Sequence, residues 1–280
     1  MGRAKDITIK VIPSKVANDF VRRWHYSGRV VNNSILHFGA FLDGSLHGVM
    51  SFGPPMDKRK VLGLVKGTLW NEMLELNRMA FDDVLPRNSE SRCIAIAMRL
   101  IRKNAPHIKW ILSFSDATQC GDGAIYRASG FLLTGIKENK QILELPDGYR
   151  LAQATVTRTG KNGGEQVRLE AQRRISKFSA TKGKSIFGSG AASIKPLLEA
   201  GAKWLPGYQL RYILLLDKSL EMTCPVLSFS KIDEMNAGMY KGEKVKQAER
   251  RPQAAIAHSG ERRASSPEGA FDATAPLNSD

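Results

Sequence analysis

The sequence has few cysteines, no long apolar run and no surplus of acidic residues. Its three cysteines are odd in number and lie far apart, which argues against a disulfide framework or a cysteine-based zinc site. No apolar run approaches the ~20 residues that cross a bilayer, and the first residues lead into no apolar segment. We therefore expect no secretory signal, no membrane partner and a cytoplasmic location.

Positive charge is what the sequence has in excess. Its 280 residues include 42 Lys and Arg against 27 Asp and Glu, a formal net charge of +15. Residues 1–136 hold 19 basic and 11 acidic residues, and residues 137–204 hold 13 and 6, whereas residues 205–280 are neutral. Such a surplus predicts a polyanionic partner, most simply nucleic acid. The alternative is charge that only keeps the protein soluble.

Hydrophobic periodicity predicts strands that alternate with helices. Strands are expected at residues 6–12, 34–42, 46–52, 73–81, 110–114, 131–134 and 208–216. Helices are expected after an N-cap at Ser14, at residues 90–103 and at residues 117–129, with Gly130 ending the last one. This order predicts an α/β fold with a sheet of mixed strand direction.

Two parts of the chain lack a clear periodic signal. Residues 137–204 are interpreted as a basic insertion, in which residues 165–179 form either a short helix or a loop. The chain then becomes poor in branched apolar residues, so residues 218–280 are expected to be a mostly disordered tail. The folded domain is therefore expected to span residues 1–217.

Several motifs, taken in order, resemble a known family. They are Trp24-His25-Tyr26-Ser27, Glu75-Leu76-Asn77-Arg78, Asn88-Ser89-Glu90-Ser91, Ser113-Phe114-Ser115-Asp116 and Pro206-Gly207-Tyr208-Gln209-Leu210-Arg211-Tyr212. Together they are similar to the Mom family of bacteriophage DNA-modification proteins. The segment from Tyr126 to Phe131 is also similar to the end of the fourth helix of GNAT acyltransferases. The resemblance implies a GNAT-like sheet, mixed but mainly antiparallel, that is flanked by helices and carries the basic insertion.

The resemblance also implies an activity. Mom proteins convert adenine in duplex DNA to N6-carbamoylmethyl-adenine, which protects phage DNA from host restriction. The donor would be an acetyl-CoA-type thioester or glycyl-tRNA, and both stay open because Arg87–Arg92 replaces the usual GNAT phosphate loop. Two alternatives remain, an N-acetyltransferase acting on a protein or small amine, and a nucleic-acid-binding protein without enzymatic activity.

The segment Arg87–Arg92 is the expected donor-binding site. Backbone N–H groups at a helix start bind anions, and small polar residues together with flanking arginines suit phosphate. The donor-binding candidates are Ser91, Asn88, Arg87 and Arg92. The alternative is an ordinary helix cap with Glu90 in the first turn.

Four residues are expected to be catalytic. Asp116, at a strand end, could take a proton from an amine or only cap the next helix. Arg78 lies late in an apolar strand and could bind the donor or only pair with Glu75 or Asp116. The resemblance implies that Tyr126 is a general acid, and the alternative is a core tyrosine. His25 could be a base or an adenine contact.

The DNA-binding surface is expected on two basic stretches. Adenine must leave the duplex before its amine can react, so a pocket would hold the base and a basic surface the phosphates. The candidates are Lys58, Arg59 and Lys60 in a loop, and Arg173 and Arg174 in the insertion. Trp24 and Tyr26 could stack on the extruded base or only pack in the core. A metal site with His37 and His47 is conceivable, but no ligand spacing supports it.

Overall fold

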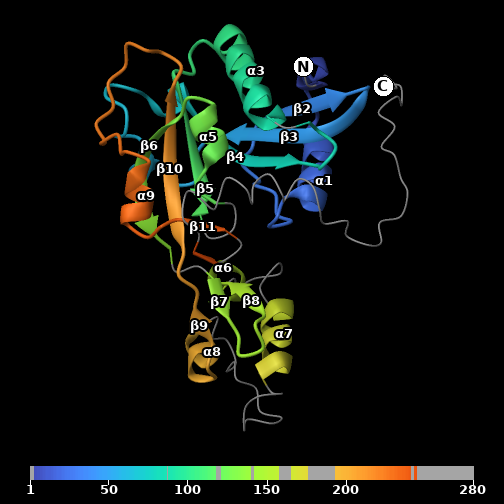
Figure 1. The fold of residues 1–280 in the computed structure, drawn as a ribbon, viewed down its shortest axis with the longest axis vertical. Helices are drawn as coiled ribbons and strands as arrows, with labels where there is room; N and C mark the ends of the chain where they lie inside the picture. The colour runs from blue at the N-terminus through green and yellow to red at the C-terminus, as the bar shows by residue number, and fades with distance from the viewer. Residues whose placement is uncertain are drawn as a thin grey trace.

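A seven-stranded sheet forms the centre of the computed structural model, which describes residues 3–86, 88–117, 121–139, 142–157, 165–175, 193–240 and 243–244. The strand order is β1-β2-β3-β4-β5-β10-β6 (Figure 1). The strands are β1 (Thr8–Val11), β2 (Leu36–Leu42), β3 (Ser45–Gly53), β4 (Met73–Phe81), β5 (Trp110–Asp116), β10 (Tyr208–Leu215) and β6 (Leu132–Glu138). Only β4 and β5 run parallel. The predicted α/β class with a mixed, mainly antiparallel sheet is confirmed.

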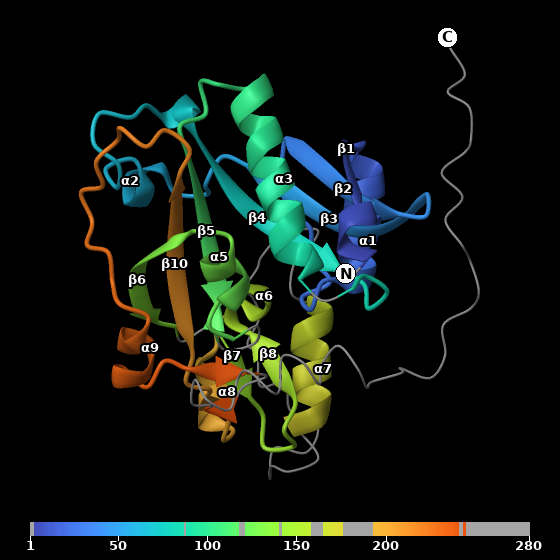
Figure 2. The ribbon, with the colours of Figure 1, turned by 45° about the horizontal axis from the view of Figure 1, so that its top comes forward.

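Helices cover both faces of this sheet. On one face, α1 (Ser14–Trp24) buries Ala17 and Val21 against Val49 and Ala80. The opposite face holds the larger apolar core, under α3 (Ser89–Asn104) and α5 (Ala124–Ala128) (Figure 2). The short elements η1 (Arg3–Asp6), α2 (Lys58–Val61) and η2 (Trp70–Glu72) connect the strands.

Some local predictions were wrong. Helix α1 begins at Ser14 itself, and Pro13 occupies the cap because its fixed φ suits a helix start. The stretch around Lys58–Lys60, expected to be a loop, is one helical turn capped by the Asp57 side chain. The helix expected at residues 117–129 is helical at 124–128, and residues 118–120 lie outside the described part.

The insertion is a folded module with a core of its own. It contains a small sheet in the order β8-β7-β9, with β7 (Ile142–Glu144), β8 (Arg150–Ala152) and β9 (Lys203–Trp204). Three helices, α6 (Gln153–Val156), α7 (Glu165–Ile175) and α8 (Lys195–Glu199), complete it. Its buried side chains are Leu143, Leu145, Leu151, Val156, Ala171, Ile175, Leu197 and Ala202. Periodicity did not reveal this module because its strands are only two or three residues long.

The expected boundary of the tail is too early. After β10 the chain continues through α9 (Ser230–Glu234) to the short strands β11 (Met239–Tyr240) and β12 (Glu243–Lys244). Ile232 and Ala237 are completely buried in the main core. They escaped prediction because the segment supplies only scattered apolar residues to a core built by other elements. Residues 245–280 lie outside the described part, so their predicted disorder stays a prediction.

Candidate active site

The central sheet opens between its two parallel strands. Strands β4 and β5 pair over four positions, from Met73 with Trp110 to Leu76 with Ser113. Beyond these positions both strands continue without pairing to each other, and both views show them running apart toward their C-terminal ends (Figures 1 and 2). The Ser113 hydroxyl donates to the Leu76 carbonyl at 3.1 Å where pairing stops. Backbone groups beyond this point can therefore face a ligand.

A β-bulge determines which face of the sheet carries Arg78. On β3, Phe52 pairs with Leu76 but Ser51 pairs with Arg78, so Asn77 is an extra residue in β4. An extra residue reverses the alternation of the side chains that follow it. Leu76 consequently points into the core under α3, whereas Arg78 points to the face that α1 covers.

The same face receives polar groups from the neighbouring strands. Glu75 pairs with Leu112, which lies on the side opposite the α3 core, and Asp116 follows Leu112 by four residues along β5. Because strand side chains alternate with period two, Glu75 and Asp116 share the face with Arg78. The site is thus a polar strip at the sheet opening, bordered by α1.

His25 stands at this strip as a neutral imidazole. It follows the last residue of α1, and its Nδ1 accepts a hydrogen bond from the backbone N–H of Ser27 at 3.1 Å. This bond requires a lone pair on Nδ1, so the ring proton belongs on Nε2. Burial, together with the nearby positive charge of Arg78, lowers the pKa of His25 to about 4. His25 therefore presents a hydrogen-bond donor at neutral pH.

Tyr26 links the end of α1 to the end of β5. Its ring lies 4.3 Å from the His25 ring, centroid to centroid, and its hydroxyl donates to the Asp116 carboxylate at 3.5 Å. The side chain is 58% exposed, so it is not a core tyrosine. An exposed aromatic ring beside a carboxylate can stack on an extruded base while the carboxylate meets the base's polar edge.

Arg78 is held by neutral oxygens. Its Nε donates to the carbonyl of Arg29 and its Nη1 to the carbonyl of Asn77, both at 2.7 Å. Among the described residues, no salt bridge joins it to Glu75 or Asp116, so the alternative of a structural ion pair is not what holds it. Burial lowers the pKa of Arg78 and raises the pKa of Glu75 to about 7. The guanidinium keeps its charge available for an anionic or carbonyl ligand.

Asn77, which precedes Arg78, and Asn33 each have a polar side-chain atom without a partner among the described residues. Ser34 donates to Asn77 Oδ1 at 2.9 Å, but the buried Nδ2 of Asn77 has no partner among the described residues. The same holds for the buried Oδ1 of Asn33, which precedes Ser34. A buried polar atom without a partner costs about 1–3 kcal/mol, and such atoms call for an explanation. Their position beside the strip is consistent with a functional site.

Tyr126 lies on the opposite face of the sheet. It is 9% exposed and belongs to the main core, with its ring 5.2 Å from Tyr212 and 5.5 Å from Phe131. The structure therefore brings three of the four catalytic candidates together, His25, Arg78 and Asp116, and places the fourth in an aromatic cluster beneath α5. The role of Tyr126 as a general acid stays a prediction.

The donor-binding candidates lie at the start of α3. This helix follows β4 and precedes β5, so its N-terminus is at the end of the sheet where the two strands separate. Asn88 adopts the left-handed conformation, with a φ of 67°, and the Ser91 hydroxyl donates to its carbonyl at 3.2 Å. Arg92 turns toward η1 and donates to the Lys5 carbonyl at 3.3 Å. Arg87 lies outside the described residues.

The basic turn α2 is remote from this strip. Two residues after α2 fix its position. Val65 forms an isolated β-bridge with Met222, and the Thr68 hydroxyl accepts a hydrogen bond from the indole of Trp110, the first residue of β5. Asp116 is the last residue of that strand, about 20 Å away at the usual rise per residue. Lys58, Arg59 and Lys60 are exposed, but they lie at the end of the sheet opposite the catalytic candidates.

The inserted module lies at the same end of the sheet as the strip. The chain leaves β6 at Glu138 and returns at Tyr208, which pairs with Glu138 next to the pairing of Gln209 with Asp116. Both ribbon views place the module beyond the end of β5 (Figures 1 and 2). A basic surface on this module would therefore adjoin the catalytic candidates.

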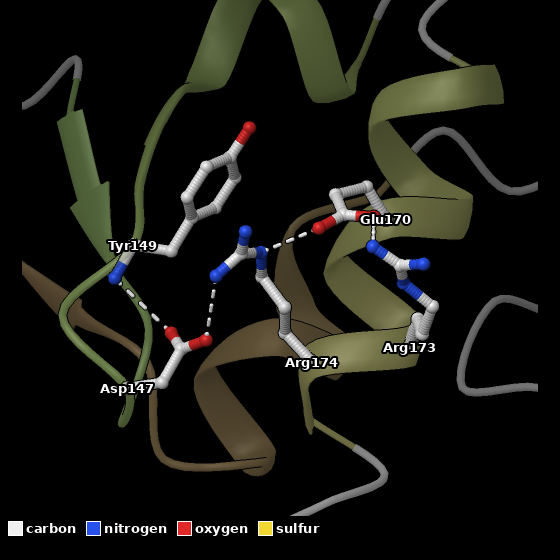
Figure 3. A network of polar contacts seen from close by, with 5 residues as sticks. All are labelled: Asp147, Tyr149, Glu170, Arg173 and Arg174. Atoms are coloured by element: carbon white, nitrogen blue, oxygen red, sulfur yellow. Dashed lines mark hydrogen bonds and ion pairs between the residues drawn. The ribbon is translucent and has the colours of Figure 1, made fainter.

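The two arginines of α7 differ in their surroundings. Arg174 donates to Asp147 at 3.0 Å and to Glu170 at 2.6 Å, and its guanidinium lies 3.9 Å from the Tyr149 ring (Figure 3). Arg173 contacts the other oxygen of Glu170 at 2.7 Å and is 72% exposed (Figure 3). Arg174 thus joins α7 to the turn after β7, whereas Arg173 can face a phosphate.

The described part of the chain shows no candidate metal site and no helix that could span a membrane. No three His, Cys, Asp or Glu side chains there gather into a group that could hold a metal ion. His37 bonds to Ser51 and His47 to Asp82, each at 2.8 Å, so the two histidines serve separate contacts. Among the same residues, no helix has both the length and the apolar character of a membrane span.

Sequence reasoning underrated some residues of the strip. Glu75 was considered only as a partner for Arg78, although a carboxylate in an otherwise apolar strand is itself a signal. Asn77 and Arg211 occur in the motifs but received no role. Asn33 carries no sequence signal, because only the fold brings its neighbour Ser34 into contact with Asn77.

Comparison with known proteins identifies the family. The model of the Mom protein family matches residues 6–231, which is most of the chain. The methylcarbamoylase mom of Escherichia phage Mu is 36% identical over 171 residues, covering 61% of this chain and 70% of the phage protein. This chain belongs to the Mom protein family.

Similar solved structures include acetyltransferases, at much lower identity. A Bacillus subtilis acetyltransferase in complex with CoA is 11% identical, with a TM-score of 0.38, and the match covers 75% of this chain and 99% of that one. A GNAT family acetyltransferase from Elizabethkingia anophelis with acetyl-CoA bound is also 11% identical, with a TM-score of 0.36, covering 75% and 98%.

Proposed function

We propose that this chain is a phage- or prophage-borne transferase that converts adenine in duplex DNA to N6-carbamoylmethyl-adenine in the host cytoplasm and so protects DNA from restriction. The observation that carries the proposal is the gathering of His25, Tyr26, Arg78 and Asp116 on one face of the sheet opening. Membership of the Mom protein family, together with the methylcarbamoylase relative, gives this site its reaction class.

Each residue has a role that its surroundings support. Tyr26 stacks on the extruded adenine, and Asp116 accepts the proton that the amine loses when its nitrogen attacks the donor's carbonyl carbon. His25 donates from Nε2 to the acyl oxygen, and Arg78 supports the negative charge that develops there. The bond from the carbonyl carbon to the donor's sulfur or ribose oxygen breaks, and the leaving atom takes a proton. Tyr126, the proposed source, lies on the opposite face of the sheet, so it would deliver the proton where β4 and β5 separate.

The donor remains one of two chemical classes, an acetyl-CoA-type thioester or glycyl-tRNA. Glycyl transfer gives N6-glycyl-adenine, which has the same atoms as N6-carbamoylmethyl-adenine. If the glycyl amine then displaces N6 from C6 of the ring, the former N6 becomes the amide nitrogen and no further reagent is needed. The start of α3, with Asn88, Ser91 and Arg92, is the proposed binding site for the phosphate groups of the donor. Arg87 is included because it directly precedes Asn88 in the sequence.

The phosphates of the DNA backbone need a basic surface near the strip. The inserted module is the better candidate because it lies beyond the end of β5, and Arg173 on α7 is exposed. Lys58, Arg59 and Lys60 could contact only a flanking part of the duplex, given their place at the other end of the sheet.

The test is chemical. Purified protein is incubated with duplex DNA and with either acetyl-CoA or glycyl-tRNA, and the DNA is digested to nucleosides for mass spectrometry. We expect N6-carbamoylmethyl-deoxyadenosine with glycyl-tRNA, whereas acetyl transfer from acetyl-CoA would give N6-acetyl-deoxyadenosine, which lacks the amide nitrogen. Asp116→Asn and Tyr126→Phe should lose at least 100-fold in rate while retaining DNA affinity. No modified adenosine with either donor would contradict the proposal, and loss of DNA binding in both variants would make their loss of activity uninformative about catalysis.

A further inference from the structure

Arg211 lies on the same face of the sheet as Arg78 and Asp116. On β10, Leu210 and Tyr212 point into the core under α3, so Arg211 between them points to the opposite face. It pairs with Phe114 on β5, and the next pair on that face joins Gln209 to Asp116. Arg78 on β4 and Arg211 on β10 therefore flank the end of β5 from its two sides.

The Arg211 guanidinium is fixed by neutral oxygens. Its Nε donates to the Thr134 hydroxyl at 3.0 Å and its Nη2 to the Thr134 carbonyl at 2.8 Å. Thr134 is the extra residue of a second bulge, between the pairs Arg211 with Gly135 and Tyr212 with Leu133. A Cβ on Gly135 would lie 3.4–3.5 Å from three guanidinium atoms, which is van der Waals distance, so the guanidinium lies directly against β6.

This charge has no carboxylate partner among the described residues, in contrast to Arg174 on the module. The exposed Lys137 pairs with Gln209 and so adds a second cation to the same face. An arginine that is pre-oriented by its own strand pair, half-buried and free of carboxylates is suited to phosphate, which it can bind with its remaining N–H groups.

We infer that Arg211 is a phosphate-binding residue of this site. The inference rests on the proposed function, because it assigns the phosphate either to the backbone of the DNA nucleotide whose base enters the strip or to the donor. The chemistry is the same in both cases. The hydrogen bonds from Arg211 on β10 to Thr134 on β6 hold the guanidinium in place before any ligand arrives. This reduces the conformational entropy that is lost on binding.

The two sources are separated by binding measurements on the full chain. Fluorescence anisotropy with a 30-base-pair duplex, over a range of salt concentrations, is compared with titrations of coenzyme A and of deacylated tRNA. If the phosphate belongs to DNA, Arg211→Gln should raise the Kd for duplex about 5–10-fold and reduce the salt slope by about 0.9. If it belongs to the donor, the Kd for coenzyme A or tRNA should rise by a similar factor while the duplex Kd stays constant.

Two further variants keep the inference testable if Arg211→Gln unfolds. Arg211→Lys retains the charge but loses the planar group that donates twice to Thr134, and it should weaken the same ligand. Arg102→Gln removes one exposed charge from the last turn of α3 and serves as the control. Unchanged binding of all three probes by Arg211→Gln, or losses equal to those of Arg102→Gln, would overturn the inference. The proposed function fails separately, if the wild-type protein modifies no adenine.

Discussion

Glu75 is the residue of the strip whose protonation should be visible in the stability of the whole protein. Its pKa is raised to about 7 by burial, from an ordinary 4.5, so the folded state binds a proton more tightly than the unfolded state. The stabilisation is complete below pH 4.5 and is lost as the pH rises toward 7. The shift corresponds to roughly 3 kcal/mol at most.

Glu75→Gln should therefore stabilise the protein more at pH 8 than at pH 5. The amide cannot ionise, so it avoids the cost of burying the charged wild-type carboxylate above pH 7. We expect the substitution to raise the free energy of unfolding by about 2 kcal/mol more at pH 8 than at pH 5. Urea unfolding at the two pH values measures the difference. Glu138→Gln, at an exposed position of β6, is the matched control. Equal effects of Glu75→Gln at both pH values would show that Glu75 is ionised throughout.

At the scale of single residues, sequence reasoning could predict membership of the site but not the face on which each residue lies. His25, Arg78 and Asp116 were predicted from their motifs, and the fold gathers them. The orientation of Arg78 depends on the bulge at Asn77. A simple alternation of strand residues would place the Arg78 side chain on the wrong face of the sheet. Tyr126 shows the converse, since its motif is present while its ring packs in the core.

Among the elements, α7 illustrates how one arginine can serve structure and its neighbour can serve binding. Charge alone made Arg173 and Arg174 equal candidates for DNA contact. In the folded module, Arg174 joins the helix to the turn at Asp147 and stacks on Tyr149, whereas Arg173 remains exposed. The difference arises from tertiary contacts between segments more than 20 residues apart, which the sequence does not show.

Arg174→Ala should destabilise the inserted module, because it removes a cation–π contact and two partly exposed ion pairs. Hydrogen exchange at the amides of β7 and α7 reports this local stability. Arg173→Ala should leave the exchange rates unchanged and raise the salt-sensitive Kd for duplex DNA instead. If both variants behave alike, the division of roles between the two arginines is wrong.

For the main sheet, sequence periodicity was sufficient because six of its seven strands have at least seven residues. The strands of the inserted module are shorter, so their pattern is too brief to recognise. The same limit explains the tail boundary, since α9 has five residues and a single fully buried side chain, Ile232. Short elements are defined by the core they join rather than by their own periodicity.

The charge of the whole molecule is concentrated away from the C-terminus. Residues 1–204 carry all of the surplus, and residues 245–280 contain five basic and five acidic residues. Within residues 137–204, the ranges 158–164 and 176–192 supply five basic residues and no acidic one. The described ranges 142–157, 165–175 and 193–204 have six basic and five acidic residues. DNA affinity should therefore depend on the insertion and not on the last 36 residues.

Two truncations separate the folded part of the C-terminus from the rest. Ending the chain after residue 244 removes no net charge and no residue of the described core, so the melting temperature and the salt slope of DNA binding should stay unchanged. Ending it after Asp217 removes Ile232, Ala237 and Phe229 from the main core. The loss of Ile232 alone should cost about 2 kcal/mol, so this variant should melt several degrees lower. An equally stable protein after the second truncation would mean that residues 218–240 do not belong to the core, and weaker DNA binding after the first would give the neutral segment a direct role in binding.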